Sequence, residues 1–180
     1  DDILKCINLI SEKNVIVFGN LPYNISTQIL ANLILLKKWP PWYSNLIFMF
    51  QKEVAERIIA KKNTPEYGRL SVLSNWRLDI IKHFNVSKNS FHPKPRVDST
   101  LLSFKPKNNK FKIKNPKNLE KITAIFFSNR RKMINKNFFK LFGRNKKIEE
   151  ELNLNLNKRP GELSHEMYYK ITLKYENLFN

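Results

Sequence analysis

Short apolar strands alternate with amphipathic helices over the first hundred residues, and no other feature constrains the fold as strongly. Four apolar residues, Val15–Phe18, predict a short buried strand, and the apolar positions of residues 26–36 recur at helical spacing. The same alternation then predicts strands over Leu46–Phe50, Asp79–Asn85 and Thr100–Phe104, and helices over Lys52–Ala60 and Arg69–Trp76. This order of elements is typical of an α/β layered domain.

The pattern changes after Phe104. Residues 105–115 are basic and irregular, so we interpret them as a linker, and residues 116–180 are helical in pattern. Asn115 followed by Pro116 predicts a helix N-cap and a first-turn proline. The apolar spacing predicts helices over Lys117–Ser128, Arg130–Phe142, Lys146–Leu152 and Ser164–Leu178.

Positive charge is concentrated in this second part. The chain carries 33 Lys and Arg against 15 Asp and Glu, and fifteen of those bases but only one acid lie between Lys105 and Lys147. Such segregation favours a polyanionic partner, either nucleic acid or an anionic membrane, over a merely solvated lysine-rich surface. No apolar run is long enough to span a membrane. The single cysteine, Cys6, excludes an intrachain disulfide and a cysteine-built metal cluster.

The stretch FGNLPYNIST follows the first predicted strand and contains the candidate site. Ligands of open α/β sheets lie beyond the carboxyl ends of the strands, which is where Asn20 to Tyr23 fall. The Asn20 amide oxygen and the backbone carbonyl of Leu21 or Pro22 can accept hydrogen bonds from an exocyclic amine. The ring of Tyr23 offers a flat face on which a base can stack. These four residues therefore suit an extruded adenine, although a simple strand-to-helix turn explains the tetrapeptide equally well.

Only four glycines occur in the chain, and none forms a glycine-rich cofactor loop. Doubly wound sheets usually have five or more strands, with the nucleotide site in their first half. We therefore expect that the chain is the C-terminal portion of a longer protein and that it is inactive by itself.

Five blocks together resemble the rRNA adenine dimethyltransferases of the KsgA type. The blocks are NLPYNIST, QKEVAERI, YGRLSV, FHPKPRVDS and FFSNRRKMINKNF, and they cover nearly the whole chain in one order. The resemblance implies an S-adenosyl-L-methionine-dependent enzyme that dimethylates the N6 amine of two adjacent adenosines in small-subunit rRNA. It also implies a Rossmann-like catalytic part over residues 1–104, whose N-terminal portion is missing, followed by a small all-helical part that docks on rRNA.

The resemblance also implies roles for single residues. Asn20, with the backbone of Leu21 and Pro22, would accept the target amine. Tyr23 and Phe91 would stack on the base, and Asp2 and Asn20 would lie near the cofactor. The resemblance assigns Arg130, Arg131 and Lys132, which we expect near the start of a helix, to RNA binding.

The predicted function is thus rRNA adenine dimethylation with a role in ribosome assembly, by a cytoplasmic monomer without a metal. Two alternatives stay open. One is an Erm-type methyltransferase that acts on large-subunit rRNA, with which FHPKP is compatible. The other is an rRNA-binding assembly factor without catalytic activity.

Overall fold

A computed structural model describes residues 12–179, and the chain divides into two compact units. The first unit comprises residues 1–59 and 77–108, and the second comprises residues 60–76 and 109–180. Residues 60–76, which the sequence pattern groups with the α/β part, thus belong to the second unit by their contacts. The assignment of a catalytic role to one part and a docking role to the other stays a prediction.

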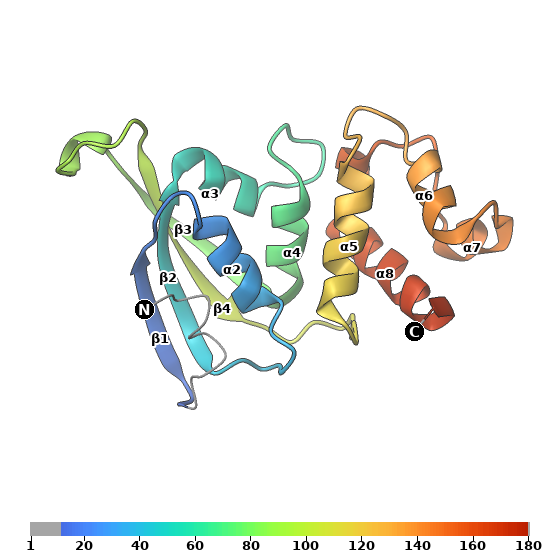
Figure 1. Ribbon diagram of the computed structural model, residues 1–180, viewed down its shortest axis with the longest axis horizontal. Coiled ribbons are helices and arrows are strands. Elements are labelled where there is room, and N and C mark those ends of the chain that lie inside the picture. The colour runs from blue at the N-terminus through green and yellow to red at the C-terminus, as the bar shows by residue number, and fades with distance from the viewer. Residues whose placement is uncertain (1–11, 180) are drawn as a thin grey trace. The chain divides into compact units, whose positions relative to one another are not determined.

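The first unit is built on one sheet, which within the described residues has four strands in the order β1-β2-β4-β3. The strands are β1 (Val15–Asn20), β2 (Tyr43–Gln51), β3 (Leu78–Val86) and β4 (Ser99–Pro106), shown in Figure 1. β1 and β2 are parallel, whereas β4 is antiparallel to both β2 and β3. All four predicted strands are therefore present, each somewhat longer than its apolar run.

Helices α2 (Ser26–Ile34) and α3 (Lys52–Ile59) lie in front of this sheet in Figure 1. The strands bury alternate side chains, because successive residues of a strand point to opposite faces. Phe48, Phe50 and Phe104 pack against one another in the core, with ring centroids 6.0–6.3 Å apart. Gly19 pairs with Phe48 across β1 and β2, and a Cβ atom at Gly19 would lie 3.1 Å from that ring. The glycine that ends the first apolar run therefore makes room for the core.

The prediction that the first strand is buried is wrong for half of its apolar residues. Phe18 is 72% exposed and Ile16 is 50% exposed, whereas Val15 and Val17 are half-buried. Among the described strands β1 lies at the edge of the sheet, so only its alternate residues face the core.

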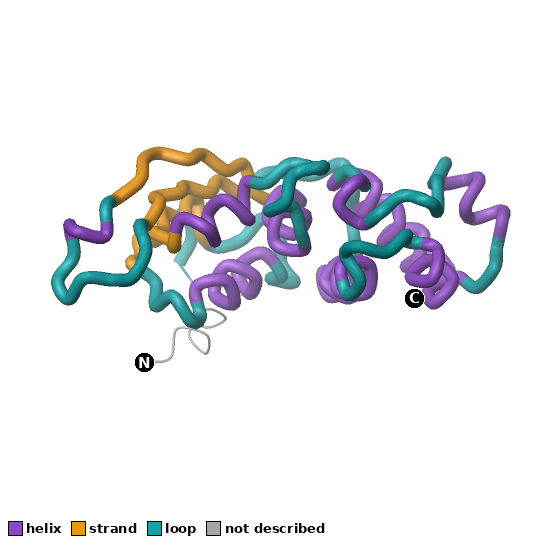
Figure 2. The backbone as a smooth tube through the Cα atoms, turned by 90° about the horizontal axis from the view of Figure 1, so that it is seen from above, coloured by secondary structure: helices purple, strands orange, loops and turns teal. Residues whose placement is uncertain are grey.

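The segment between β3 and β4 projects from the sheet and contains a short 3₁₀ helix, Lys88–Ser90, seen at the left of Figure 2. Ser87 caps this helix, since its hydroxyl accepts a hydrogen bond from the Asn89 amide at 3.2 Å. Phe91 follows the helix directly, with an extended backbone. The chain then returns through a proline-rich loop to β4.

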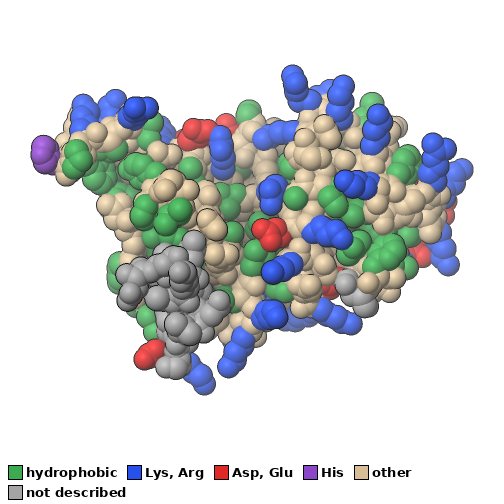
Figure 3. All heavy atoms as spheres, in the orientation of Figure 1, with side chains coloured by type: hydrophobic (Ala, Val, Ile, Leu, Met, Phe, Trp, Pro, Cys, Tyr) green, Lys and Arg blue, Asp and Glu red, His purple; other side chains and the backbone are tan. Residues whose placement is uncertain are grey.

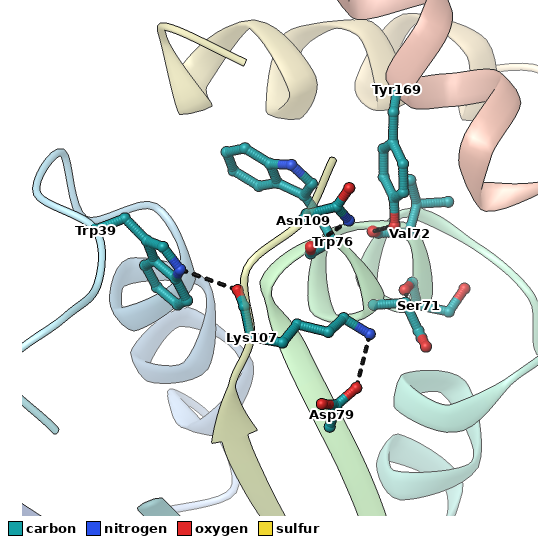
Figure 4. Close-up of polar contacts among 9 residues, drawn as sticks. Trp39, Ser71, Val72, Trp76, Asp79, Lys107, Asn109 and Tyr169 are labelled. Carbon is teal, nitrogen blue, oxygen red and sulfur yellow. Dashed lines mark hydrogen bonds and ion pairs between the residues drawn. The ribbon is translucent and has the colours of Figure 1, made fainter. Parts of the chain in front are cut away.

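The second unit is helical. Its elements are α4 (Arg69–Arg77), α5 (Pro116–Phe127), α6 (Asn135–Phe142), α7 (Lys146–Leu152), a 3₁₀ helix (Pro160–Glu162) and α8 (His165–Phe179). Buried tyrosines join segments that are far apart in the sequence. The Tyr169 hydroxyl donates to the Val72 carbonyl at 3.0 Å (Figure 4), and the Tyr67 hydroxyl donates to the Leu163 carbonyl at 2.8 Å. Burial raises the pKa of both tyrosines, so they stay protonated donors at neutral pH.

Helix α5 begins as the sequence predicts, with Asn115 as its N-cap and Pro116 in its first turn. The Asn115 side chain accepts a hydrogen bond from the Lys117 amide at 3.1 Å. A second acceptor comes from the far end of the chain: the carboxylate of Glu176 in α8 accepts from the Lys114 and Asn115 amides, each at 2.8 Å. It also accepts from the Asn118 side-chain amide at 3.0 Å. Glu176 is only 3% exposed, so this carboxylate fastens the start of α5 to α8.

Candidate active site

The residues Asn20 to Tyr23 form the turn that joins β1 to α2. The Pro22 carbonyl accepts a hydrogen bond from the Ile25 amide at 3.1 Å, and the Ser26 hydroxyl donates to the Tyr23 carbonyl at 3.2 Å. No described residue donates a hydrogen bond to the Leu21 carbonyl. Of the two backbone acceptors that the sequence left open, the Leu21 carbonyl is therefore the better placed to receive a ligand.

A pocket of about 350 Å³ brings this turn together with the loop after β3. Asn20 and Tyr23 line it from the turn, and Phe91 lines it from the loop. Asn20 is exposed, whereas Tyr23 and Phe91 are half-buried. Two candidate segments that are about seventy residues apart in the sequence thus meet in one cavity of the first unit.

The loop contributes further lining residues that the sequence analysis did not select: His92, Pro93 and Pro95. They belong to the same F-x-P-x-P stretch as Phe91, so the spacing of its prolines could have indicated that these residues also line the pocket. None of the lining side chains is a carboxylate. The pocket therefore offers aromatic faces and neutral hydrogen-bond acceptors rather than a strong base.

The basic block lies in a turn, and the prediction of a helix that starts at Arg130 is wrong. α5 ends at Phe127 and α6 begins only at Asn135, so Arg130, Arg131 and Lys132 fall between them.

Partners that are distant in the sequence fix this turn. The Ile134 amide donates to the Lys158 carbonyl at 2.9 Å, and the Asn137 side chain donates to the Phe126 carbonyl at 3.1 Å. The Arg130 guanidinium donates to the Thr64 carbonyl at 3.0 Å. All three basic residues are exposed, and Figure 3 shows many more Lys and Arg side chains over the second unit.

Comparison with known proteins identifies the family. The family model for ribosomal RNA adenine dimethylase matches residues 4–176. The chain belongs to the ribosomal RNA adenine dimethylase family. This confirms the family resemblance seen in the sequence, and with it the α/β, Rossmann-like fold followed by a helical part.

Similar proteins are named as ribosomal RNA methyltransferases or as a dimethyladenosine transferase. Ribosomal RNA small subunit methyltransferase A from Pelagibacter ubique (strain HTCC1062) is 51% identical over 179 residues, which are 99% of this chain and 68% of that protein. The protein of the same name from Rhizobium etli (strain CIAT 652) is 43% identical over 136 residues, 76% of this chain and 49% of that one. A crystal structure of a dimethyladenosine transferase from Plasmodium falciparum matches with a TM-score of 0.77 and 26% identity, over 95% of this chain and 70% of that one.

Not every residue that the dimethylase resemblance suggested can be placed. Asp2 lies outside the described residues, as does Cys6, the single cysteine of the chain. Within residues 12–179 the structure shows no group of His, Cys, Asp and Glu that could hold a metal ion. The described helices include none that is both long and apolar enough to cross a membrane.

The described residues include the predicted base-stacking residues, Tyr23 and Phe91, but no glycine-rich cofactor loop. Both aromatic rings line the pocket, and no glycine-rich turn follows a strand within residues 12–179. Asn20 is the described residue that lines the pocket and that the resemblance also places near S-adenosyl-L-methionine. Whether residues 1–180 bind that cofactor by themselves stays a prediction, which calorimetric titration can check.

Proposed function

We propose that this protein uses S-adenosyl-L-methionine to dimethylate the N6 amine of two adjacent adenosines in small-subunit rRNA. The observation that carries the proposal is the single pocket that joins Asn20, Leu21, Pro22 and Tyr23 to Phe91. The names of the relatives support small-subunit rRNA as the substrate. The proposal includes a role in ribosome assembly, in the cytoplasm and as a monomer.

The pocket would hold one base that has left its stack. Extrusion costs a few kcal/mol, and stacking on an aromatic side chain returns about 1–3 kcal/mol per base. Tyr23 and Phe91 would supply the two faces, since they line the pocket from opposite segments. Both rings are half-buried, and the pocket that they line has a volume of about 350 Å³.

Two acceptors would then orient the target amine. The lone pair of an adenine amine is delocalised into the ring, so the amine is a poor nucleophile. Hydrogen bonds from its two N–H groups to the Asn20 side-chain oxygen and the Leu21 carbonyl localise that lone pair. The same acceptors stabilise the positive charge that grows on the nitrogen. Bound S-adenosyl-L-methionine would supply an electrophilic methyl group.

This chemistry needs no strong general base, because a methylated aminium nitrogen is acidic and its proton can pass to water. The lining residues agree with that requirement, since none of those described is a carboxylate. Proximity and orientation then account for much of the rate, as they do whenever two reactants are held in line.

The proposal is tested by methyl transfer with the intact protein, a labelled methyl donor and two RNA substrates. Assembling small subunits should gain N6,N6-dimethyladenosine, measured by mass spectrometry of the digested RNA, while naked large-subunit rRNA should not. Label in the large-subunit RNA would instead indicate an Erm-type enzyme. Tight RNA binding without any transfer would indicate an assembly factor.

A separate prediction concerns the exposed turn between α5 and α6. Replacing Arg130, Arg131 and Lys132 together by glutamine should weaken rRNA binding, because phosphate contacts provide most of the affinity of such proteins. The slope of log affinity against log salt should fall by about one unit for each phosphate that the variant no longer binds. Filter binding over a range of salt concentrations measures both quantities.

Asn20→Ala is the control, since a residue of the base pocket should leave that slope unchanged. A triple variant that keeps the slope of the wild type would mean that the three side chains are only solvated. The RNA would then be bound elsewhere on the protein.

A further inference from the structure

Two adjacent residues at the start of β4 are hydrogen-bonded to the two sides of the pocket. Ser99 is the first residue of β4, and Asp98 precedes it. The Ser99 hydroxyl shares a hydrogen bond of 2.9 Å with the Tyr23 hydroxyl. The Asp98 carboxylate accepts a hydrogen bond of 2.9 Å from the Lys88 amide, which lies three residues before Phe91. Neither residue lines the pocket.

The contact on the Tyr23 side begins at a rigid point. Ser99 is fully buried and pairs with Gln51 of β2 on one side and with Val86 of β3 on the other. Its hydroxyl therefore has little freedom to move. Because the hydroxyl lies at the far end of the tyrosine side chain, a fixed partner for it restricts χ1 and so holds the position of the Tyr23 ring.

The contact on the Phe91 side works through the backbone. Asp98 ends the returning arm of the loop, and Lys88 begins the 3₁₀ helix on the outgoing arm. The Asp98 carboxylate therefore ties the two arms together at the base of the loop. The Asp98 carbonyl in turn accepts from the Lys52 amide at 2.9 Å, which fixes Asp98 to the start of α3.

We propose that Asp98 and Ser99 are positioning residues that set the gap between the Tyr23 and Phe91 rings. The inference rests on the proposed function, because it gives that gap the task of holding one base. Two adjacent residues where β4 begins would then position both aromatic rings: Ser99 acts through Tyr23, and Asp98, just before the strand, acts through the loop that carries Phe91. A shift of a fraction of an ångström in either face should cost about 10-fold in turnover, since 1 Å can cost about 100-fold.

The first experiment is a double-mutant cycle on the Tyr23–Ser99 contact in the intact protein. Tyr23→Phe and Ser99→Ala each remove one hydroxyl and leave the stacking ring in place. Each should lower kcat about 10-fold with RNA affinity unchanged, and the double variant should be no worse than either single one. Ser103→Ala is the matched control: it makes the same change on the same strand, where the hydroxyl contacts His83 at 2.8 Å. It should leave kcat unchanged.

The second experiment tests the Asp98 contact with a conservative rescue. Asp98→Ala removes the acceptor for the Lys88 amide. The loop can then shift the Phe91 ring, so kcat should fall about 10-fold. Asp98→Asn keeps a side-chain oxygen at that place and should restore most of the rate. A variant that lost activity by unfolding would show a lower melting temperature, which circular dichroism measures for each protein.

A spectroscopic readout separates positioning from simple stability. An rRNA hairpin with 2-aminopurine at the target adenosine reports stacking, because an aromatic ring stacked on that base quenches its fluorescence. Bound to Ser99→Ala or Asp98→Ala, the probe should be brighter than in the wild-type complex. Equal brightness, additive effects in the cycle or no rescue by asparagine would overturn the inference.

The same probe distinguishes failure of the proposed function from failure of this inference. A wild-type protein that changes neither the fluorescence nor the methylation of any rRNA overturns the proposed function, and the inference with it. If the wild-type protein changes the fluorescence and methylates the rRNA, and the variants give the same fluorescence and the same rate, only the inference about Asp98 and Ser99 is overturned.

Discussion

Replacing Asn20 by alanine should lower the rate of methyl transfer by about 100-fold or more, the usual cost of one preorganised polar contact to developing charge. RNA affinity should change little, because the proposed function gives the Asn20 amide a contact to one base and to no phosphate. Single-turnover rates and filter binding of the intact protein measure the two quantities.

The structure makes this variant a clean test. Asn20 is exposed at the end of β1, and no hydrogen bond to its side chain is found among the described residues, so its removal should not disturb the fold. Asn24→Ala is the matched control, since Asn24 is an exposed asparagine of the same turn region that does not line the pocket. Near-normal turnover in Asn20→Ala would mean that the residue only shapes the turn.

Glu176→Ala should lower the free energy of unfolding by about 3 kcal/mol, more than Glu176→Gln or Glu150→Ala. The variant leaves three donors without their acceptor: the Lys114 amide, the Asn115 amide and the Asn118 side chain. Each unsatisfied buried group costs about 1–3 kcal/mol. The total is smaller than the sum, because water can enter the space left by the carboxylate and accept some of these hydrogen bonds. The favourable charge at the N-terminus of α5 is lost as well.

Urea unfolding followed by circular dichroism at the helix band measures this effect. Glu176→Gln should fall between the wild type and the alanine variant, since one amide oxygen replaces two carboxylate oxygens. Glu150→Ala is the control, because Glu150 is exposed on α7 and such substitutions usually change stability by less than about 0.5 kcal/mol. A Glu176→Ala protein as stable as this control would contradict the role assigned to the carboxylate.

Local signals in the sequence predicted most of the elements. The helix over Lys146–Leu152 and the cap at Asn115 agree with the structure because both depend on neighbouring residues. The start of α6 was predicted wrongly because contacts from Lys158 and Phe126 fix it, and no local pattern carries those contacts. The exposure of Phe18 was missed for a related reason, since an apolar run does not tell an edge strand from a central one.

The residues of the candidate site were predicted from the sequence, but their contacts were not. The composition of the Asn20–Tyr23 turn predicted a place for an amine and a base, and the family resemblance added Phe91. That these residues share one pocket follows from the tertiary structure. The contacts of Asp98 and Ser99 could not be predicted, because their partners, Lys88 and Tyr23, come from other segments.

The strand order has a consequence for how the protein is made. β4 is the last of the described strands to leave the ribosome, yet it lies between β2 and β3 in the finished sheet. A nascent chain that ends before Ser99 has β1, β2, β3 and the turn at Asn20, but it lacks the strand whose first residue is hydrogen-bonded to Tyr23. Pairings between residues far apart in sequence also form slowly, since the closure of long loops is entropically costly. A chain that ends before Ser99 therefore lacks the hydrogen bond to the Tyr23 hydroxyl, so we expect the pocket to take its final form only after β4 has been made.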